Sequence, residues 1–307
     1  MVRISSFGQQ QLLIRAIQDN QRALFEDQRQ ISTGKKADNF QGLAGQTNTV
    51  LGSRSFLSRV ETYQETISTV RGKLDANDVQ IGGIIKSVET LRDTIRTSIA
   101  NSQAEGLSEQ LKLTFEFTSN ALNTNFGGSF LFSGAGADVT PVNVTDLAGL
   151  AALPAISDAF DNAAQPFVAK IADGVDTEFG LLADDIGSAV FTELRNLYNL
   201  DQGVNGPFDG PLNPTQFALL QTQLVNLETA LDGLRAVQTK NGLAFERLEV
   251  VDEQHADTSV FLQTFIADIE DVNLAEAISS LNSNQLALEA SFRSIGSLTQ
   301  LSLLNFL

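Results

Sequence analysis

The stretch that decides the fold is "VETYQETISTVRGKLDANDVQIGGIIKSVETLRDTIR", residues 60–96. Large side chains, nearly all of them apolar, recur in it at alternating spacings of three and four residues, and only Asn77 interrupts the series. A heptad seam of about five repeats predicts a long helix that packs in the manner of a coiled coil. We therefore expect one helix over residues 45–101 and a second over about 104–125. The seam positions are Val60, Tyr63, Ile67, Val70, Leu74, Ile81, Ile84, Val88, Leu91 and Ile95.

A second helical arm supplies the partner seam. Its apolar positions are Phe217, Leu220, Leu224, Leu227, Leu231, Leu234, Phe245 and Leu248, and Leu262, Ile266 and Ile269 resume the pattern. The polar residues at seam positions are Gln238, Asn241, Asp252, His255 and Ser259. All six prolines lie between Pro141 and Pro214, so proline interrupts neither arm. The predicted fold class is mainly α: a long antiparallel helical rod built from both chain ends, with a small central β-rich/α insertion.

The central part of the chain has shorter elements. The run "GGSFLFSG" at residues 127–134 suits a strand, and residues 167–182 suit two strands joined at Asp173-Gly174. We expect Asp184 and Asp185 to cap a helix that begins near Ile186. The predicted division is an N-terminal assembly helix and turn (1–44), two halves of a rod (45–130 and 214–270), the insertion (131–213) and a C-terminal assembly helix (271–307).

Composition excludes several classes of function. Lysine and arginine total 20 against 37 acidic residues, so a nucleic acid is not an expected partner. Cysteine is absent, and His255 is the only histidine, so we expect no metal site, no cofactor and no catalytic residues. The N-terminus lacks the apolar core of a signal peptide, and no run is long enough to span a membrane, so neither a cleavable signal nor membrane insertion is expected.

Both chain ends carry more apolar surface than one partner helix can cover. Residues 1–33 present two apolar faces, and the C-terminal segment has an apolar stripe followed by the tail "LSLLNFL". One face of the N-terminal segment is Ile4, Phe7, Ile14 and Phe25, and the other is Leu13, Ile17, Leu24 and Ile31. The C-terminal positions are Ile278, Leu281, Leu288, Phe292, Ile295, Leu301, Leu303, Leu304, Phe306 and Leu307. We take the first face and these C-terminal residues as a candidate assembly interface with further copies of the chain.

The charges of the two ends are complementary. Residues 1–36 contain six basic and three acidic residues, a net charge of +3. Residues 260–307 contain one basic and five acidic residues, a net charge of −4. Opposite charge favours the two terminal segments lying side by side, although exposed ion pairs are individually weak.

Two segments of the chain resemble the flagellin superfamily. "QISTGKKADNFQGLAG" (30–45) is similar to the segment that follows the first helix of flagellins, although "ADNFQGLA" departs from the usual run there. "IEDVNLAEAISSLNSNQLALEASFRSIGSLTQLSLLNFL" (269–307) resembles the C-terminal signature of that superfamily. The central sequence and the ending "LLNFL" look more like the family of hook–filament junction proteins, hook-associated protein 3, than like flagellin.

The resemblance implies a structural subunit of the bacterial flagellum. It implies self-assembly into a ring-like layer at the hook–filament junction, between a hook-side hook-associated protein and flagellin. It also implies type III export to an extracellular place in the flagellum, and a cytoplasmic chaperone that binds the C-terminal region. The alternatives are a flagellin filament subunit and a surface homologue that holds a glycan through the central region, for which the shortage of tyrosine and tryptophan is unfavourable.

Overall fold

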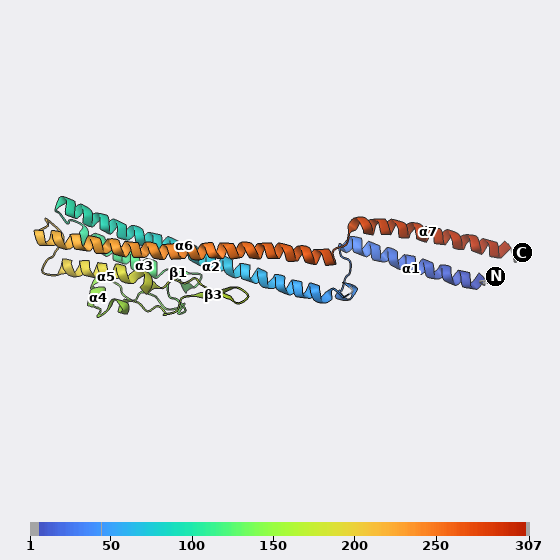
Figure 1. The fold of residues 1–307 in the computed structure, drawn as a ribbon, viewed down its shortest axis with the longest axis horizontal. Coiled ribbons are helices and arrows are strands. Elements are labelled where there is room, and N and C mark those ends of the chain that lie inside the picture. The colour runs from blue at the N-terminus through green and yellow to red at the C-terminus, as the bar shows by residue number, and fades with distance from the viewer. Residues whose placement is uncertain (1–5, 44, 305–307) are drawn as a thin grey trace. The chain divides into compact units, whose positions relative to one another are not determined.

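The computed structural model describes residues 6–43 and 45–304, with side chains described for residue 8 and residues 11–43 and 45–296. The described chain is mainly helical, as predicted (Figure 1). Its α-helices are α1 (Ser6–Thr33), α2 (Thr47–Asn101), α3 (Leu107–Leu122), α4 (Leu147–Ala152), α5 (Ala183–Gln202), α6 (Pro214–Glu270) and α7 (Leu274–Leu304). Two short 3-10 helices are η1 (Phe40–Leu43) and η2 (Ile156–Ala159).

In the described residues, the β-strands form two small antiparallel ribbons. Strands β1 (Asn125–Phe126) and β2 (Ser129–Phe130) form one ribbon, and β3 (Val168–Ala172) and β4 (Val175–Glu178) form the other. The second ribbon turns at Gly174, whose φ of 72° favours glycine. The fold class predicted from the sequence, helical arms with a small β-containing insertion, is confirmed.

The chain divides into two compact units. The terminal unit contains the residues up to Arg59 and those from Thr258 onward, and the central unit is Val60–Asp257. The boundaries therefore fall inside α2 and α6. The five-part division expected from the sequence stays a prediction.

The central unit is built around the predicted seam. The α2 positions of this seam are all buried except Tyr63, which is half-buried. On α6, Leu220, Leu227 and Leu231 are fully buried. Hydrogen-bonded ion pairs join Arg96 to Glu228 and Arg235 to Glu89 on the flanks of this seam. Their order along the chain makes α2 and α6 antiparallel.

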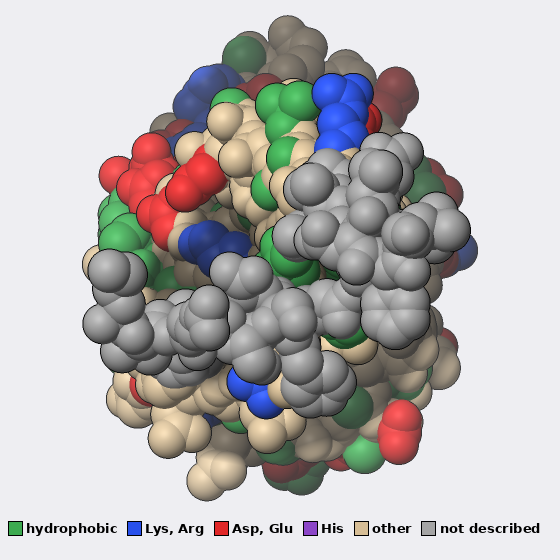
Figure 2. All heavy atoms as spheres, turned by 90° about the vertical axis from the view of Figure 1, so that its right-hand side faces the viewer, with side chains coloured by type: hydrophobic (Ala, Val, Ile, Leu, Met, Phe, Trp, Pro, Cys, Tyr) green, Lys and Arg blue, Asp and Glu red, His purple; other side chains and the backbone are tan. Residues whose placement is uncertain are grey.

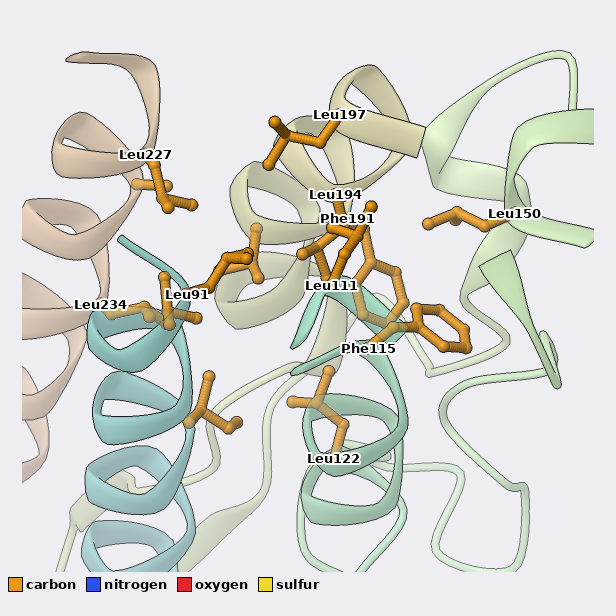
Figure 3. Close-up of a cluster of buried hydrophobic side chains, with 14 of the residues drawn as sticks. Leu91, Leu111, Phe115, Leu122, Leu150, Phe191, Leu194, Leu197, Leu227 and Leu234 are labelled. Atoms are coloured by element: carbon orange, nitrogen blue, oxygen red, sulfur yellow. The ribbon is translucent and has the colours of Figure 1, made fainter. Parts of the chain in front are cut away.

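A second layer of helices completes this core. Phe115 of α3 and Phe191 of α5 lie with their ring centroids 5.4 Å apart, and Phe160 stacks on Phe191. Figure 3 shows the rings of Phe115 and Phe191 among leucines from α2, α3, α4, α5 and α6, including Leu91 and Leu150. One continuous apolar cluster therefore joins the long helices to the insertion.

The β3–β4 ribbon packs on the seam of the central unit at His255. Ile171 of β3 is fully buried in a small apolar cluster with α2 and α6 residues. The Nε2 of His255 lies 2.7 Å from the backbone oxygen of Ile171, and the His255 ring stacks on Tyr63. The Tyr63 hydroxyl donates to Asp173 at 2.7 Å. His255 is thus a packing residue that positions the ribbon.

Two local predictions for the insertion were wrong. The run at residues 127–134 forms strand only at Ser129–Phe130, because Gly127 and Gly128, with left-handed backbone angles, form the turn between β1 and β2, and the residues after Phe130 belong to no strand. Helix α5 begins at Ala183 with Leu182 as its N-cap, so Asp184 and Asp185 lie in the first turn and neither is the cap. Their charge still favours the positive end of the helix dipole.

The described residues contain no membrane helix and no metal cluster. None of the helices in this part of the chain combines the length and the apolar character that a membrane span requires. Nor do residues 6–43 and 45–304 bring together three or more histidine, aspartate or glutamate side chains that could hold a metal ion.

Candidate assembly surface

In the terminal unit, α1 and α7 lie side by side (Figure 1). The less exposed side chains of both helices recur at spacings of three and four, which is the pattern of a two-helix seam. On α1 they are Leu13, Ile17, Asn20, Leu24, Asp27 and Ile31, and on α7 they are Ala277, Leu281, Asn284, Leu288, Ser291 and Ile295. One of the two predicted apolar faces of α1 is thus turned toward α7.

A polar pair lies inside this seam. The Nδ2 of Asn284 donates to the Oδ2 of Asp27 at 2.7 Å, and the Asp27 residue is only 8% exposed. A buried polar pair costs desolvation but strongly disfavours registers in which it loses its partner. We infer that this pair helps to fix how α1 and α7 align.

The other predicted face of α1 stays in water. Ile14 is 51% exposed and Phe25 is 69% exposed, and their separation of eleven residues places them on one side of the helix. On α7, Ile278 is 48% exposed and Phe292 is 52% exposed. Figure 2 looks at this end of the terminal unit, where described apolar side chains lie beside charged ones. Full burial of each such side chain would contribute about 1.5–3 kcal/mol.

The predicted interface residues therefore fall into three groups. Ile14, Phe25, Ile278 and Phe292 are exposed, whereas Leu281, Leu288 and Ile295 are half-buried on the α1-facing side of α7. Ile4, Phe306 and Leu307 lie outside the described residues, as do the side chains of Phe7, Leu301, Leu303 and Leu304. The assignment of all these residues to an interface stays a prediction.

Three exposed leucines were missed by the sequence reasoning. Leu12, Leu274 and Leu286 are each at least half exposed on the same two helices. They lie off the stripes that were followed along the sequence. Scoring every large apolar residue outside the two-helix seam would have found them.

The linkers at the base of α1 and α7 are joined by backbone hydrogen bonds. The amide of Lys36 donates to the carbonyl of Glu270 at 2.7 Å, and the amide of Val272 donates to the carbonyl of Gly34 at 2.9 Å. These bonds form an isolated antiparallel bridge between Lys35 and Asp271. We call residues 34–38 and 268–272, together with Arg29 and Arg54, the corner.

Ion pairs reinforce the corner. Lys35 Nζ lies 2.6 Å from an oxygen of Asp271, and this hydrogen bond raises the pKa of the Lys35 ammonium above its ordinary value. Arg29 pairs with Asp38 and with Glu26, and these hydrogen bonds raise the pKa of its guanidinium. The opposite charges of the two chain ends therefore meet at the corner, where Lys35 pairs with Asp271.

Comparison with known proteins finds similarity to helical proteins of the bacterial flagellum. Residues 4–137 match the family model of the bacterial flagellin N-terminal helical region. The N-terminal arm of this chain is thus similar to the helical region of flagellins. The resemblance to the flagellin superfamily inferred from the sequence is confirmed by this match.

Solved structures share the fold. A chain from Vibrio parahaemolyticus assigned as a flagellar hook-associated protein superposes with a TM-score of 0.57 at 16% identity, over 72% of this chain and 96% of that one. FlgL of Bacillus cereus superposes with a TM-score of 0.56 at 15% identity, over 70% of this chain and 98% of that one. No curated protein matches the sequence. At this level of identity the two structures support the fold.

Proposed function

We propose that this chain is a structural subunit of the bacterial flagellum, and that copies of it pack together through α1 and α7. The observation that carries the proposal is the second apolar face of this helix pair, represented by Phe25 and Phe292. An exposed face of this kind in a flagellin-type helical arm is best explained by neighbouring subunits. Its role is packing, and no reaction is part of the proposal.

Within the flagellum, we place the chain at the junction between hook and filament, as a ring-like layer between a hook-side hook-associated protein and flagellin. Two features support this placement over a filament subunit. The fold matches chains assigned as hook-associated protein and FlgL over nearly their whole length. The central sequence also resembles the junction family more than flagellin.

Export belongs to the same proposal. The chain would leave the cell by the flagellar type III route and act outside it, with a cytoplasmic chaperone on its C-terminal region beforehand. The support is the exposed apolar character of α7, where Leu286 and Phe292 are largely uncovered. Such a helix would need a cover before assembly.

Deleting the gene tests the placement. The junction role predicts that hooks remain while filament protein appears in the medium, because a filament without its junction layer does not stay attached. Under the filament-subunit alternative, which the flagellin family match keeps open, the filament protein itself would be missing. Stoichiometry separates the two further, because a ring-like layer needs few copies and a filament needs many.

A further inference from the structure

We propose that Glu270 is the centre of a charge latch that holds the α1–α7 pair at the ends of α2 and α6 within the terminal unit. The proposal concerns the isolated chain and does not depend on its place in the flagellum. It predicts that opening the latch releases α1 and α7 as an intact pair.

Glu270 has an unusual position for a carboxylate. It is the last residue of α6, and its side chain is only 8% exposed. Arg54 of α2 donates from Nη2 to both of its carboxylate oxygens, at 2.8 and 2.7 Å, and Lys35 Nζ lies 3.4 Å from Oε2. One nearly buried anion therefore ties α2, α6 and the linker after α1 together. A buried charge that loses its partners is strongly destabilising locally.

The two linkers are also restrained by bonds that do not involve the Glu270 side chain. Three residues separate Glu270 from the start of α7 at Leu274. The backbone bridge between Lys35 and Asp271 fixes the two linkers to each other, and Lys36 Nζ donates to the carbonyl of Asp268 at 2.6 Å. These bonds join linker to linker and linker to α6. Arg54 of α2 donates to the carboxylate of Glu270 and so joins α2 to α6 and the linkers.

Helices α1 and α7 are also held together by contacts outside the corner. The seam of α1 and α7 and the hydrogen bond between Asp27 and Asn284 do not involve Glu270. Losing the contacts of the Glu270 carboxylate therefore weakens the attachment of the pair to α2 and α6 and leaves the pair itself intact. Salt should have the same effect as mutation, because the side chains of Lys35 and Arg54 are about half exposed and are open to screening.

Spin labels on engineered cysteines test the latch directly, since the chain has no cysteine of its own. One label pair, at Gln263 and Ser283, spans the corner from α6 to α7, and a second, at Gln11 and Ser283, spans the α1–α7 pair; all three residues are exposed. In Glu270→Gln and in Arg54→Met, we expect the 263–283 distance distribution to become at least about twofold broader. The 11–283 distribution should keep its width.

The matched control is Asp232→Asn, which removes the same charge from an exposed ion pair with Arg235 in the central unit. It should leave both distributions unchanged. If Glu270→Gln loses its helical circular dichroism, the wild-type chain in about 1 M salt replaces it, and broadening of the 263–283 distribution alone supports the latch. Unchanged distributions in the variants and in salt would overturn the proposal, and so would equal broadening of both label pairs.

Discussion

Asn77 of α2 and Asn241 of α6 face each other inside the seam of the central unit. The Nδ2 of Asn77 lies 3.4 Å from the Oδ1 of Asn241, and the Nδ2 of Asn241 donates to the carbonyl of Leu74 at 2.9 Å. The Oδ1 of Asn77 is buried without a partner among the described residues. This polar layer interrupts an apolar seam and therefore lowers the stability of the central unit. It also favours one alignment of the two helices, the one in which the two asparagines meet.

Replacing both asparagines by leucine should stabilise the central unit. We expect the double variant Asn77→Leu with Asn241→Leu to raise the free energy of unfolding by about 1–3 kcal/mol, because two buried amides are exchanged for apolar side chains of similar volume. Asn241→Leu alone should lower it by about 1–3 kcal/mol, since Asn77 then stays buried without any side-chain partner. Urea unfolding of the wild type and the two variants checks both signs, and an Asn241→Leu variant more stable than the wild type would contradict this account.

Two adjacent glycines in α2 should respond differently to alanine. A Cβ at Gly82 would meet only the Nε2 of Gln238, at 3.9 Å, so Gly82→Ala should stabilise by about 0.5–1 kcal/mol through helix propensity. A Cβ at Gly83 would lie 2.9 Å from the ring of Phe117, which must then move. Gly83→Ala should therefore be clearly less stable than Gly82→Ala. Thermal unfolding of the two variants measures the difference, and equal melting temperatures would show that the Phe117 ring yields freely.

Lys73 gives a pH dependence with a definite sign. Its ammonium lies 4.4 Å from the centroid of the Phe167 ring, and burial lowers the pKa of Lys73 below its ordinary value of 10.5. Between the lowered folded pKa and the unfolded pKa, the unfolded chain binds more protons, so this group's contribution to stability increases as the pH rises. The stability of the wild type relative to Lys73→Met should thus improve from about pH 7 to about pH 10. A constant or falling difference in urea unfolding would contradict the sign.

The sequence predicted the elements that depend on local periodicity. The α2 seam was foreseeable because each position from Val60 to Ile95 reports its own burial through its spacing. Tyr63 is less buried than its neighbours because its hydroxyl reaches Asp173, a contact between residues 110 positions apart. Local pattern carries no information on such a partner.

The candidate site was predictable only in part for the same reason. The two apolar faces of α1 follow from the helical period, and the structure turns Leu24 toward α7 and Phe25 toward water. The corner was not foreseen, because Lys35 meets Asp271 and Arg54 meets Glu270 across more than 200 residues of sequence. The net charges of the two ends predicted that the ends attract each other, but they did not identify which residues pair.

The most direct test of the central claim is to change the exposed face of α1 and α7 without changing the fold. Phe25→Gln combined with Phe292→Gln removes two large exposed rings, and Leu243→Gln combined with Val250→Gln is the matched control on exposed positions of α6 in the central unit. Incorporation into flagella of cells that lack the native chain is measured beside the melting temperature of each purified monomer. We predict that the first variant melts within a few degrees of the wild type but fails to incorporate, while the control incorporates normally. Normal incorporation of the Phe25 and Phe292 variant would contradict the claim that this face is the assembly surface.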